Sequence, residues 1–125
     1  MASAKHLTAV VVEDDRDQRA LAATLLEETE FEVIECDSAE AALDVLHART
    51  DPVALVFTDV RLAGRLNGVE LARILDNDSP DTSVVVTSGD SRDRLGDLPA
   101  NTVYVAKPWR ALEVLILAEW VRTLA

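Results

Sequence analysis

Three consecutive carboxylates follow an apolar run near the start of the chain. The run 10–12 leads directly into Glu13, Asp14 and Asp15, and no glycine separates the apolar and acidic residues. Two carboxylates about 5 Å apart repel each other by roughly 3 kcal/mol at an effective dielectric constant near 20. A cluster of carboxylate side chains in a fold therefore requires a cation.

Three further polar side chains end other apolar runs. Asp59 ends the run in "LVFTDV", Thr87 ends the run in "VVVTSGD", and Lys107 ends the run in "VYVAKPW". In an open parallel α/β sheet, ligands bind beyond the carboxyl ends of the strands, where residues from different strands converge. We therefore expect acids, a hydroxyl group and one amine to share a rim of the sheet.

This expected cluster suits Mg²⁺. Short carboxylates offer all-oxygen ligands, and Mg²⁺ keeps several waters, which leaves positions open for phosphoryl oxygens. The chain has only two histidines, His6 and His47, and one cysteine, Cys36, so it has no ligand set that selects zinc. A single strand-end acid can simply cap the next helix. Capping does not explain acids, a hydroxyl group and a lysine at the ends of three separate strands.

The elements that position these residues follow from the hydrophobic pattern. Short apolar runs alternate with stretches of helical spacing, which predicts βα units around a parallel sheet. Strands are expected at 8–12, 32–35, 54–58, 83–87 and 103–106. The first, third and fourth runs are rich in Val without alternation, so we expect them to be buried on both faces.

Helices are expected between these strands. The predicted ranges are 20–28, a helix that follows the N-cap Ser38 with Glu40 in its first turn, 68–75, a weak helix over 91–98, and 111–124. Gly96 and Pro99 limit the fourth of these to about two turns. The fold class is therefore α/β, with five strands and five helices, the fourth helix being short.

Composition predicts one soluble domain over residues 1–125. The 125 residues are 49% apolar, which is enough for one packed core. With 12 basic against 23 acidic residues, we expect no binding to nucleic acid or anionic membranes. No apolar run approaches the ~20 residues of a membrane span, and no signal peptide is visible. Since the single cysteine cannot form an internal disulfide, we expect a cytoplasmic protein.

Over essentially its whole length the chain resembles the receiver domain of two-component response regulators, of the stand-alone, chemotaxis-receiver-like kind. The matching residues are Glu13, Asp14, Asp59, Thr87, Tyr104 and Lys107, with Pro108 directly after the lysine. The resemblance implies a flavodoxin-like, doubly wound sheet with strand order 2-1-3-4-5. It also implies a signalling phosphoacceptor, not an enzyme, that assists its own phosphorylation and dephosphorylation. Because almost nothing remains after the last predicted helix, we expect no output domain.

The resemblance implies a role for each residue around the acidic cluster. Asp59 accepts a phosphoryl group from a phosphohistidine on a histidine kinase or a histidine phosphotransfer protein. Asp14, Asp59 and the backbone carbonyl of Arg61 bind Mg²⁺, and Glu13 contributes directly or through water.

Three other residues act on the phosphoryl group or report its presence. By the same resemblance, Lys107 pairs with one phosphoryl oxygen and Thr87 hydrogen-bonds another. Tyr104 changes position together with Thr87, which alters the contacts to a downstream protein. The peptide bond between Lys107 and Pro108 is expected to be cis.

Two surfaces are candidates for partner binding. We expect Arg16, Arg19 and Ala23 on the outward side of the first helix, where kinases dock in relatives, and a solvated helix face is the alternative. The last helix places apolar residues around more than one stripe and includes Trp120, a typical anchor residue. This pattern indicates a homodimer or a partner contact, against a broad core face as the alternative.

The loop after Asp59 departs from the family pattern. The segment "DVRLAGRLNG" is one residue longer than usual before the glycine that matches Gly68, and it lacks the usual proline near Ala63. Arg61 lies where a side chain can reach over the phosphoryl group. We hypothesise that Arg61 tunes the lifetime of the aspartyl phosphate.

Competing functions are disfavoured at named positions. A phosphatase of the haloacid dehalogenase kind requires a second aspartate two residues after the nucleophile, where this chain has Arg61. A flavodoxin-like FMN binder requires hydroxyl groups and glycines after the first strand, where the letters are "EDDRDQ". The main alternative is a receiver-like interaction scaffold that is not phosphorylated, and the intact Asp59 and Lys107 argue against it.

Overall fold

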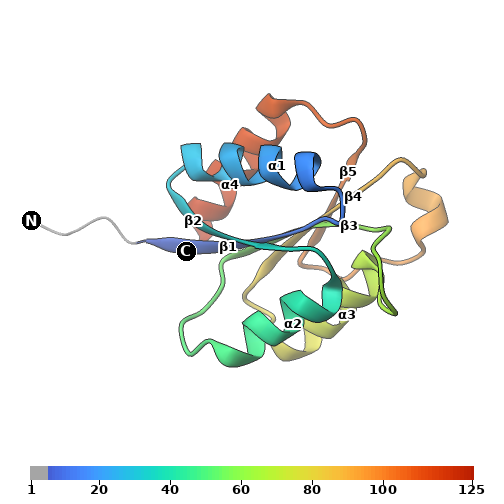
Figure 1. The fold of residues 1–125 in the computed structure, drawn as a ribbon, viewed down its shortest axis with the longest axis horizontal. Helices are drawn as coiled ribbons and strands as arrows, with labels where there is room; N and C mark the ends of the chain where they lie inside the picture. Colours follow the sequence, from blue (N-terminus) through green and yellow to red (C-terminus); the bar gives the residue numbers. More distant parts are fainter. Residues whose placement is uncertain (1–5) are drawn as a thin grey trace, which may run out of the picture.

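The computed structural model describes residues 6–125, in which five strands alternate with helical segments (Figure 1). The strands are β1 (Leu7–Val12), β2 (Phe31–Cys36), β3 (Leu55–Asp59), β4 (Ser83–Ser88) and β5 (Thr102–Ala106). The α-helices are α1 (Arg16–Glu28), α2 (Ala39–Ala48), α3 (Gly68–Asp78) and α4 (Ala111–Leu124). The sequence predicts all of these elements, with small differences at their ends: α1 begins at Arg16 rather than residue 20, and α3 continues to Asp78.

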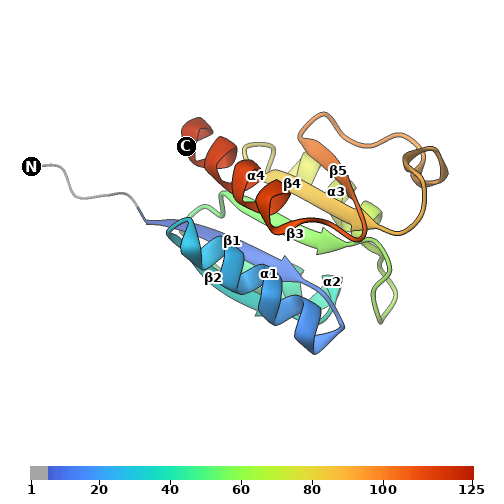
Figure 2. The same ribbon diagram turned by 90° about the horizontal axis from the view of Figure 1, so that it is seen from above.

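All strand pairs are parallel, and the strand order is β2-β1-β3-β4-β5, as predicted. Helices α1 and α4 cover one face of the sheet, and α2 and α3 cover the other (Figures 1 and 2). The carboxyl ends of the strands lie at the right in Figure 1, where β1 leads into α1. This edge is where the polar strand ends meet.

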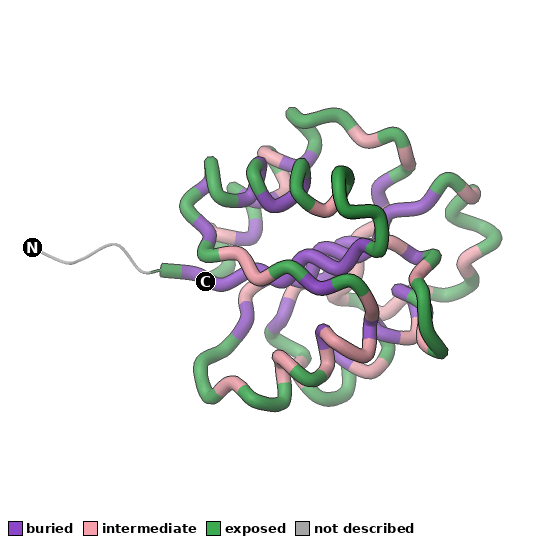
Figure 3. The backbone as a smooth tube through the Cα atoms, in the orientation of Figure 1, coloured by how far each residue is buried: buried purple, intermediate pink, exposed green. Residues whose placement is uncertain are grey.

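The central strands are buried on both faces. All six residues of β1 are buried, as are most residues of β3 and β4, and the sheet forms the buried interior of the molecule in Figure 3. Alternate side chains of β1 contribute to two apolar clusters: Val11 packs on the side of α1 and α4, and Val10 packs on the side of α2 and α3. The rigid sheet therefore fixes the strand ends that carry the polar residues.

The predicted fourth helix is not an α-helix. Within the described residues, the segment between β4 and β5 contains only a 3₁₀ turn, η1 (Arg92–Leu95), and none of its residues is buried. Gly96 follows with φ +75°, a conformation that ends helical hydrogen bonding, and Pro99 prevents its resumption. The helix labelled α4 is consequently the one that the sequence predicts as the fifth.

Helix α4 has two apolar faces. Val114, Ala118 and Val121 are buried against the sheet. Leu115 and Leu117 are partly buried beside them, and four large apolar side chains of this helix are exposed: Leu112, Ile116, Trp120 and Leu124. Within residues 6–125, no helix is long and apolar enough to cross a membrane.

Candidate functional site

Three carboxylates meet at the carboxyl edge of the sheet. Glu13 and Asp14 follow β1, Asp59 ends β3, and one carboxylate oxygen of each lies within 4.8 Å of the others. The strands β1 and β3 are neighbours, and Val12 pairs with Thr58, so the residues just beyond them lie side by side. Glu13 is buried, with 7% of its surface exposed, whereas Asp14 is exposed. The cluster thus has a buried floor and an open side.

Lys107 brings a cation into this cluster. Its Nζ donates to Asp59 Oδ2 at 2.9 Å, to Glu13 Oε1 at 3.0 Å and to Gln18 Oε1 at 3.0 Å. The lysine follows β5, and its peptide bond with Pro108 is cis, as predicted. Gln18 is a partner that sequence reasoning misses, because a glutamine in the first turn of a helix gives no signal of a contact 89 residues away.

Burial and charge act in opposite directions on these groups. Burial raises the pKa of Glu13, although the Asp15 backbone amide and the Lys107 ammonium favour its ionised form. Burial also opposes ionisation of Lys107, but hydrogen bonds to Asp59 and Glu13 outweigh it, and the pKa of Lys107 is raised. One ammonium cannot offset three carboxylates. A further cation at the open side would stabilise the ionised cluster.

The donor set fits Mg²⁺. All three side chains offer carboxylate oxygens, and the described residues place no histidine or thiol with them. Oxygen ligands that leave one side of the site open to solvent suit a cation that retains several waters. The Arg61 amide donates to Asp59 Oδ1 at 3.3 Å, which holds the start of the β3–α3 loop beside the cluster. Receiver domains bind Mg²⁺ at an acidic pocket of this kind.

Thr87 and Tyr104 lie on the two strands beyond Asp59. Thr87 pairs in register with Asp59 and is almost fully buried, with 1% of its surface exposed. Tyr104, on β5, is partly buried, and its hydroxyl donates to the Asp90 carbonyl at 2.6 Å. The phenol ring is therefore tied to the loop that follows Thr87. Any movement of that loop also moves the hydrogen-bond partner of Tyr104.

The guanidinium of Arg61 lies outside the carboxylate cluster. Its Nη2 is 3.4 Å from Asp90 Oδ2, and 83% of its side chain is exposed. This ion pair connects the loop after β3 with the loop after β4. Because this ion pair is exposed, it contributes only about 0–1 kcal/mol to stability.

The two arginines predicted for partner binding have different surroundings. Arg16, at the start of α1, is exposed. Arg19 is engaged within the protein: its Nη1 donates to the Glu13 carbonyl at 2.8 Å, and its Nε lies 3.4 Å from Glu35 Oε1. Asp15 is the N-cap of α1, so this third acid of the run serves helix capping. Of the two arginines, Arg16 has the more accessible side chain.

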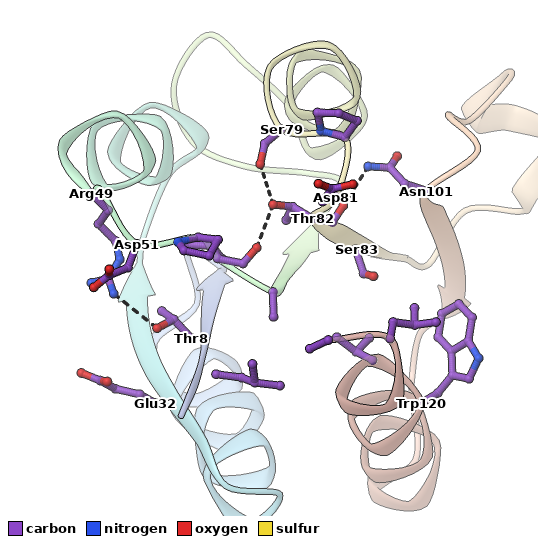
Figure 4. A pocket seen from close by; sticks show the side chains of 18 of the residues that line it. Thr8, Glu32, Arg49, Asp51, Ser79, Asp81, Thr82, Ser83, Asn101 and Trp120 are labelled. Carbon is purple, nitrogen blue, oxygen red and sulfur yellow. Dashed lines mark hydrogen bonds between the residues drawn. The ribbon is translucent and has the colours of Figure 1, made fainter. Parts of the chain in front are cut away.

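Trp120 lies at the other end of the molecule. It lines a groove of about 1090 Å³ at the amino ends of the strands, shown in Figure 4. Two hydrogen bonds join the residues that line this groove. The Thr82 hydroxyl donates to the Val53 carbonyl, and the Asn101 side-chain amide donates to the Thr82 carbonyl. The groove includes none of the carboxylates of the cluster. The structure therefore separates Trp120 from the acidic site.

Comparison with known proteins identifies similar chains. A family model described as the response regulator receiver domain matches residues 9–116. The chain is 32% identical over 113 residues to the heme response regulator HssR of Staphylococcus saprophyticus, and 35% identical over 81 residues to the nitrogen assimilation regulatory protein NtrX of Azorhizobium caulinodans. These matches cover 86% and 64% of this chain. The chain spans only 48% and 17% of the length of these relatives.

Solved structures share the fold. The receiver domain of NtrX from Brucella abortus has a TM-score of 0.76 and 29% identity, with 94% of this chain and 99% of that chain covered. The signal receiver domain of an HD domain-containing protein from Pseudomonas fluorescens Pf-5 has a TM-score of 0.84, with 97% and 90% covered. Its identity is 20%, so this second likeness concerns the fold alone.

Proposed function

Since the chain belongs to the family of response regulator receiver domains, we propose that it is a phosphoacceptor switch in which Asp59 takes the phosphoryl group. One observation carries this proposal. The Asp59 carboxylate lies beside Glu13 and Asp14 and accepts a hydrogen bond from Lys107 at 2.9 Å. An oxygen nucleophile with cations around it is what phosphoryl transfer requires, because little other covalent chemistry is involved.

The transfer exchanges one bond to phosphorus for another. An oxygen of Asp59 attacks the phosphorus of a phosphohistidine, the P–N bond breaks as the O–P bond forms, and the imidazole keeps the released electron pair. Lys107 is within reach of the phosphoryl group on Asp59 and stabilises its negative charge. Asp14, Asp59 and the Arg61 carbonyl would hold Mg²⁺, with Glu13 contributing directly or through water, and the bound ion would supply further positive charge to the phosphoryl oxygens.

The switch acts through the loops beyond β3 and β4. Thr87 lies next to Asp59 in the sheet, so its hydroxyl is positioned to donate to a phosphoryl oxygen once the group is present. That bond draws the loop after β4 toward Asp59. Because the Tyr104 hydroxyl donates to Asp90 in the same loop, the movement reaches the surface around β5.

The protein partners follow from this switch. A histidine kinase or histidine phosphotransfer protein delivers the phosphoryl group near Arg16, and a downstream protein reads the altered surface. A second copy of this chain binds the exposed apolar side of α4, which carries Leu112, Ile116, Trp120 and Leu124 at intervals of four residues. The net charge of −11 disfavours nucleic acid as a target of this domain.

The alternative is a phosphorylation-independent interaction scaffold with the same fold. Incubation with acetyl phosphate and Mg²⁺, followed by intact mass spectrometry, separates the two functions. We expect one added phosphate in the wild-type chain and none in Asp59→Asn. Asp37→Asn is the matched control, because Asp37 follows β2 as Asp14 follows β1 but lies outside the cluster. Absence of added phosphate in the wild type would favour the scaffold.

A further inference from the structure

We propose that Glu40 is a positioning residue for the phosphoacceptor site, because its carboxylate clamps the loop that follows Asp59. The inference rests on the proposed function in one respect: the Arg61 carbonyl, at the start of this loop, is a ligand of Mg²⁺ there. Glu40 belongs to α2 and touches neither the metal ligands nor the phosphoryl group. Its effect on the site is transmitted by the backbone of residues 61–66.

The first observation is a pair of hydrogen bonds across the fold. Glu40 Oε2 accepts from the Arg65 amide at 2.9 Å and from the Leu66 amide at 3.2 Å. A bridge between Ser38 and Ala63 joins the same two segments. The loop between β3 and α3 is therefore attached to the start of α2, 25 residues away in sequence.

The second observation is the glycine that faces this carboxylate. Gly64 has φ +98°, and a Cβ atom at this position would lie 2.8 Å from Glu40 Oε1. That oxygen is buried and has no hydrogen-bond partner among the described residues, and the missing Cβ of Gly64 leaves room for it. The glycine thus allows the turn and also the approach of Glu40.

Charge favours the clamp as well. The amides of Glu40 itself, Arg65 and Leu66 favour the ionised carboxylate and lower its pKa. The carboxylate also lies in the first turn of α2, where a helix favours negative charge. Glu40 is consequently ionised at neutral pH, and its bonds to the loop are charge-assisted.

The clamp adds a third attachment to a loop whose two ends are already held. The Arg61 amide donates to Asp59 Oδ1 at 3.3 Å, and the Gly68 amide donates to the Val60 carbonyl at 2.8 Å, so both ends of the loop are attached to the end of β3. Glu40 holds its tip. This third attachment compensates for the extra residue in the segment "DVRLAGRLNG", which otherwise gives the Arg61 carbonyl more freedom.

Removal of the clamp should weaken the metal site without unfolding the domain. We expect Glu40→Ala to weaken Mg²⁺ binding by about tenfold, the low end for residues that orient metal ligands. Glu40→Gln retains one acceptor oxygen, so it should restore part of this loss. Gly64→Ala disturbs the same contact from the loop side. The double variant with Glu40→Ala and Gly64→Ala should therefore lose less Mg²⁺ binding free energy than the sum of the losses in the two single variants.

Calorimetric titration with Mg²⁺ and amide hydrogen exchange at Arg65 and Leu66 test the proposal. Asp44→Ala is the control, because Asp44 is an exposed acid one turn further along α2. Weaker Mg²⁺ binding and faster exchange in Glu40→Ala, with Asp44→Ala unchanged, support the clamp. Wild-type Mg²⁺ affinity in Glu40→Ala overturns it.

The same experiments give a different result if the proposed function itself is wrong. If the wild-type chain itself binds no Mg²⁺, the metal site is wrong, and the exchange rates alone decide whether Glu40 clamps the loop. Exchange of the Arg65 and Leu66 amides that is faster in Glu40→Ala than in the wild type then supports the clamp. Unchanged exchange contradicts it.

Discussion

The Lys107 ammonium lies 2.9 Å from the Asp59 carboxylate, although β4 separates the strands that carry them. The same ammonium is 3.0 Å from Glu13. It therefore lies between two carboxylates of the cluster that would also bind a metal ion. Lys107 and a divalent cation repel each other, yet both attract a phosphoryl group on Asp59. Removal of the Lys107 charge should therefore favour metal binding and weaken the binding of an anionic group at Asp59.

Replacement of Lys107 by Met separates these two effects. Mg²⁺ should bind at least as tightly as in the wild type, because a neighbouring positive charge is removed. Beryllofluoride, a mimic of the phosphoryl group, should bind at least about tenfold more weakly, equivalent to about 1.4 kcal/mol. Calorimetric titrations with Mg²⁺ alone and then with beryllofluoride measure both. Arg110→Met removes an exposed charge nearby and should change neither. Unaltered beryllofluoride affinity in Lys107→Met would contradict the assigned role.

The strand ends could be predicted because they follow from the hydrophobic pattern. The Val-rich runs before Glu13, Asp59 and Thr87 have no polar alternation, so they had to be central strands of a parallel sheet. Parallel strands end at a common edge, and this rule places the three residues together without knowledge of the loops. The weak helix over 91–98 was wrong, because its helical spacing had no buried apolar residue behind it.

The contacts that depend on tertiary packing could not be predicted. The sequence indicates that Glu40 lies in the first turn of a helix, which is correct, but its bonds to Arg65 and Leu66 depend on how two loops meet. Gln18 likewise reaches Lys107 only because α1 begins beside the end of β5. Arg19 was expected to face a partner, yet it bonds the carbonyl of Glu13. Ala23, expected on the outward side of α1, is buried.

Substitution of Arg61 tests whether its side chain, which pairs with Asp90, tunes the lifetime of the aspartyl phosphate. Arg61→Asn should shorten the lifetime of the aspartyl phosphate by a factor on the order of 3 to 10, which corresponds to at most about 1.4 kcal/mol of barrier. The reason is steric and electrostatic, since a bulky cation beside Asp90 hinders the approach of water. Decay of phosphate followed by mass spectrometry gives the rate. The melting temperature should hardly change, because the ion pair is exposed. An unchanged decay rate contradicts the hypothesis.

Gly68→Ala tests the close packing between the start of α3 and the end of β3. A Cβ atom at Gly68 would clash with the Asp59 carbonyl oxygen, and backbone atoms cannot move aside cheaply. We expect the free energy of unfolding to fall by about 1–3 kcal/mol or more, as in overpacked cores. Gly89→Ala is the matched control, because nothing lies within 4 Å of its Cβ position. Equal stability of the two variants in urea denaturation would show that the contact is not tight.

Acid should remove the stabilising effect of the Glu40 carboxylate. Its pKa is lower in the folded chain than the ordinary value of 4.5, since backbone amides hydrogen-bond the ionised form. A lowered pKa gives stability that is present above pH 4.5 and is lost as the pH falls through the folded value. The wild type should therefore exceed Glu40→Gln in stability at neutral pH, and the difference should shrink below pH 4.5. Urea denaturation across this pH range measures it. A difference that does not change with pH would exclude the charge as its source.

The exposed stripe on α4 predicts self-association. Its four apolar side chains recur every four residues, a spacing that forms one ridge along a helix and packs against an equal ridge of a second copy. Ile116→Glu places a charge in the middle of this ridge, so we expect it to shift the sedimentation of the chain from dimer to monomer. Leu21→Glu introduces the same charge at an exposed leucine of α1, outside the ridge, and should leave the dimer intact. A wild-type chain that sediments as a monomer at high concentration, with and without beryllofluoride, would rule out this interface.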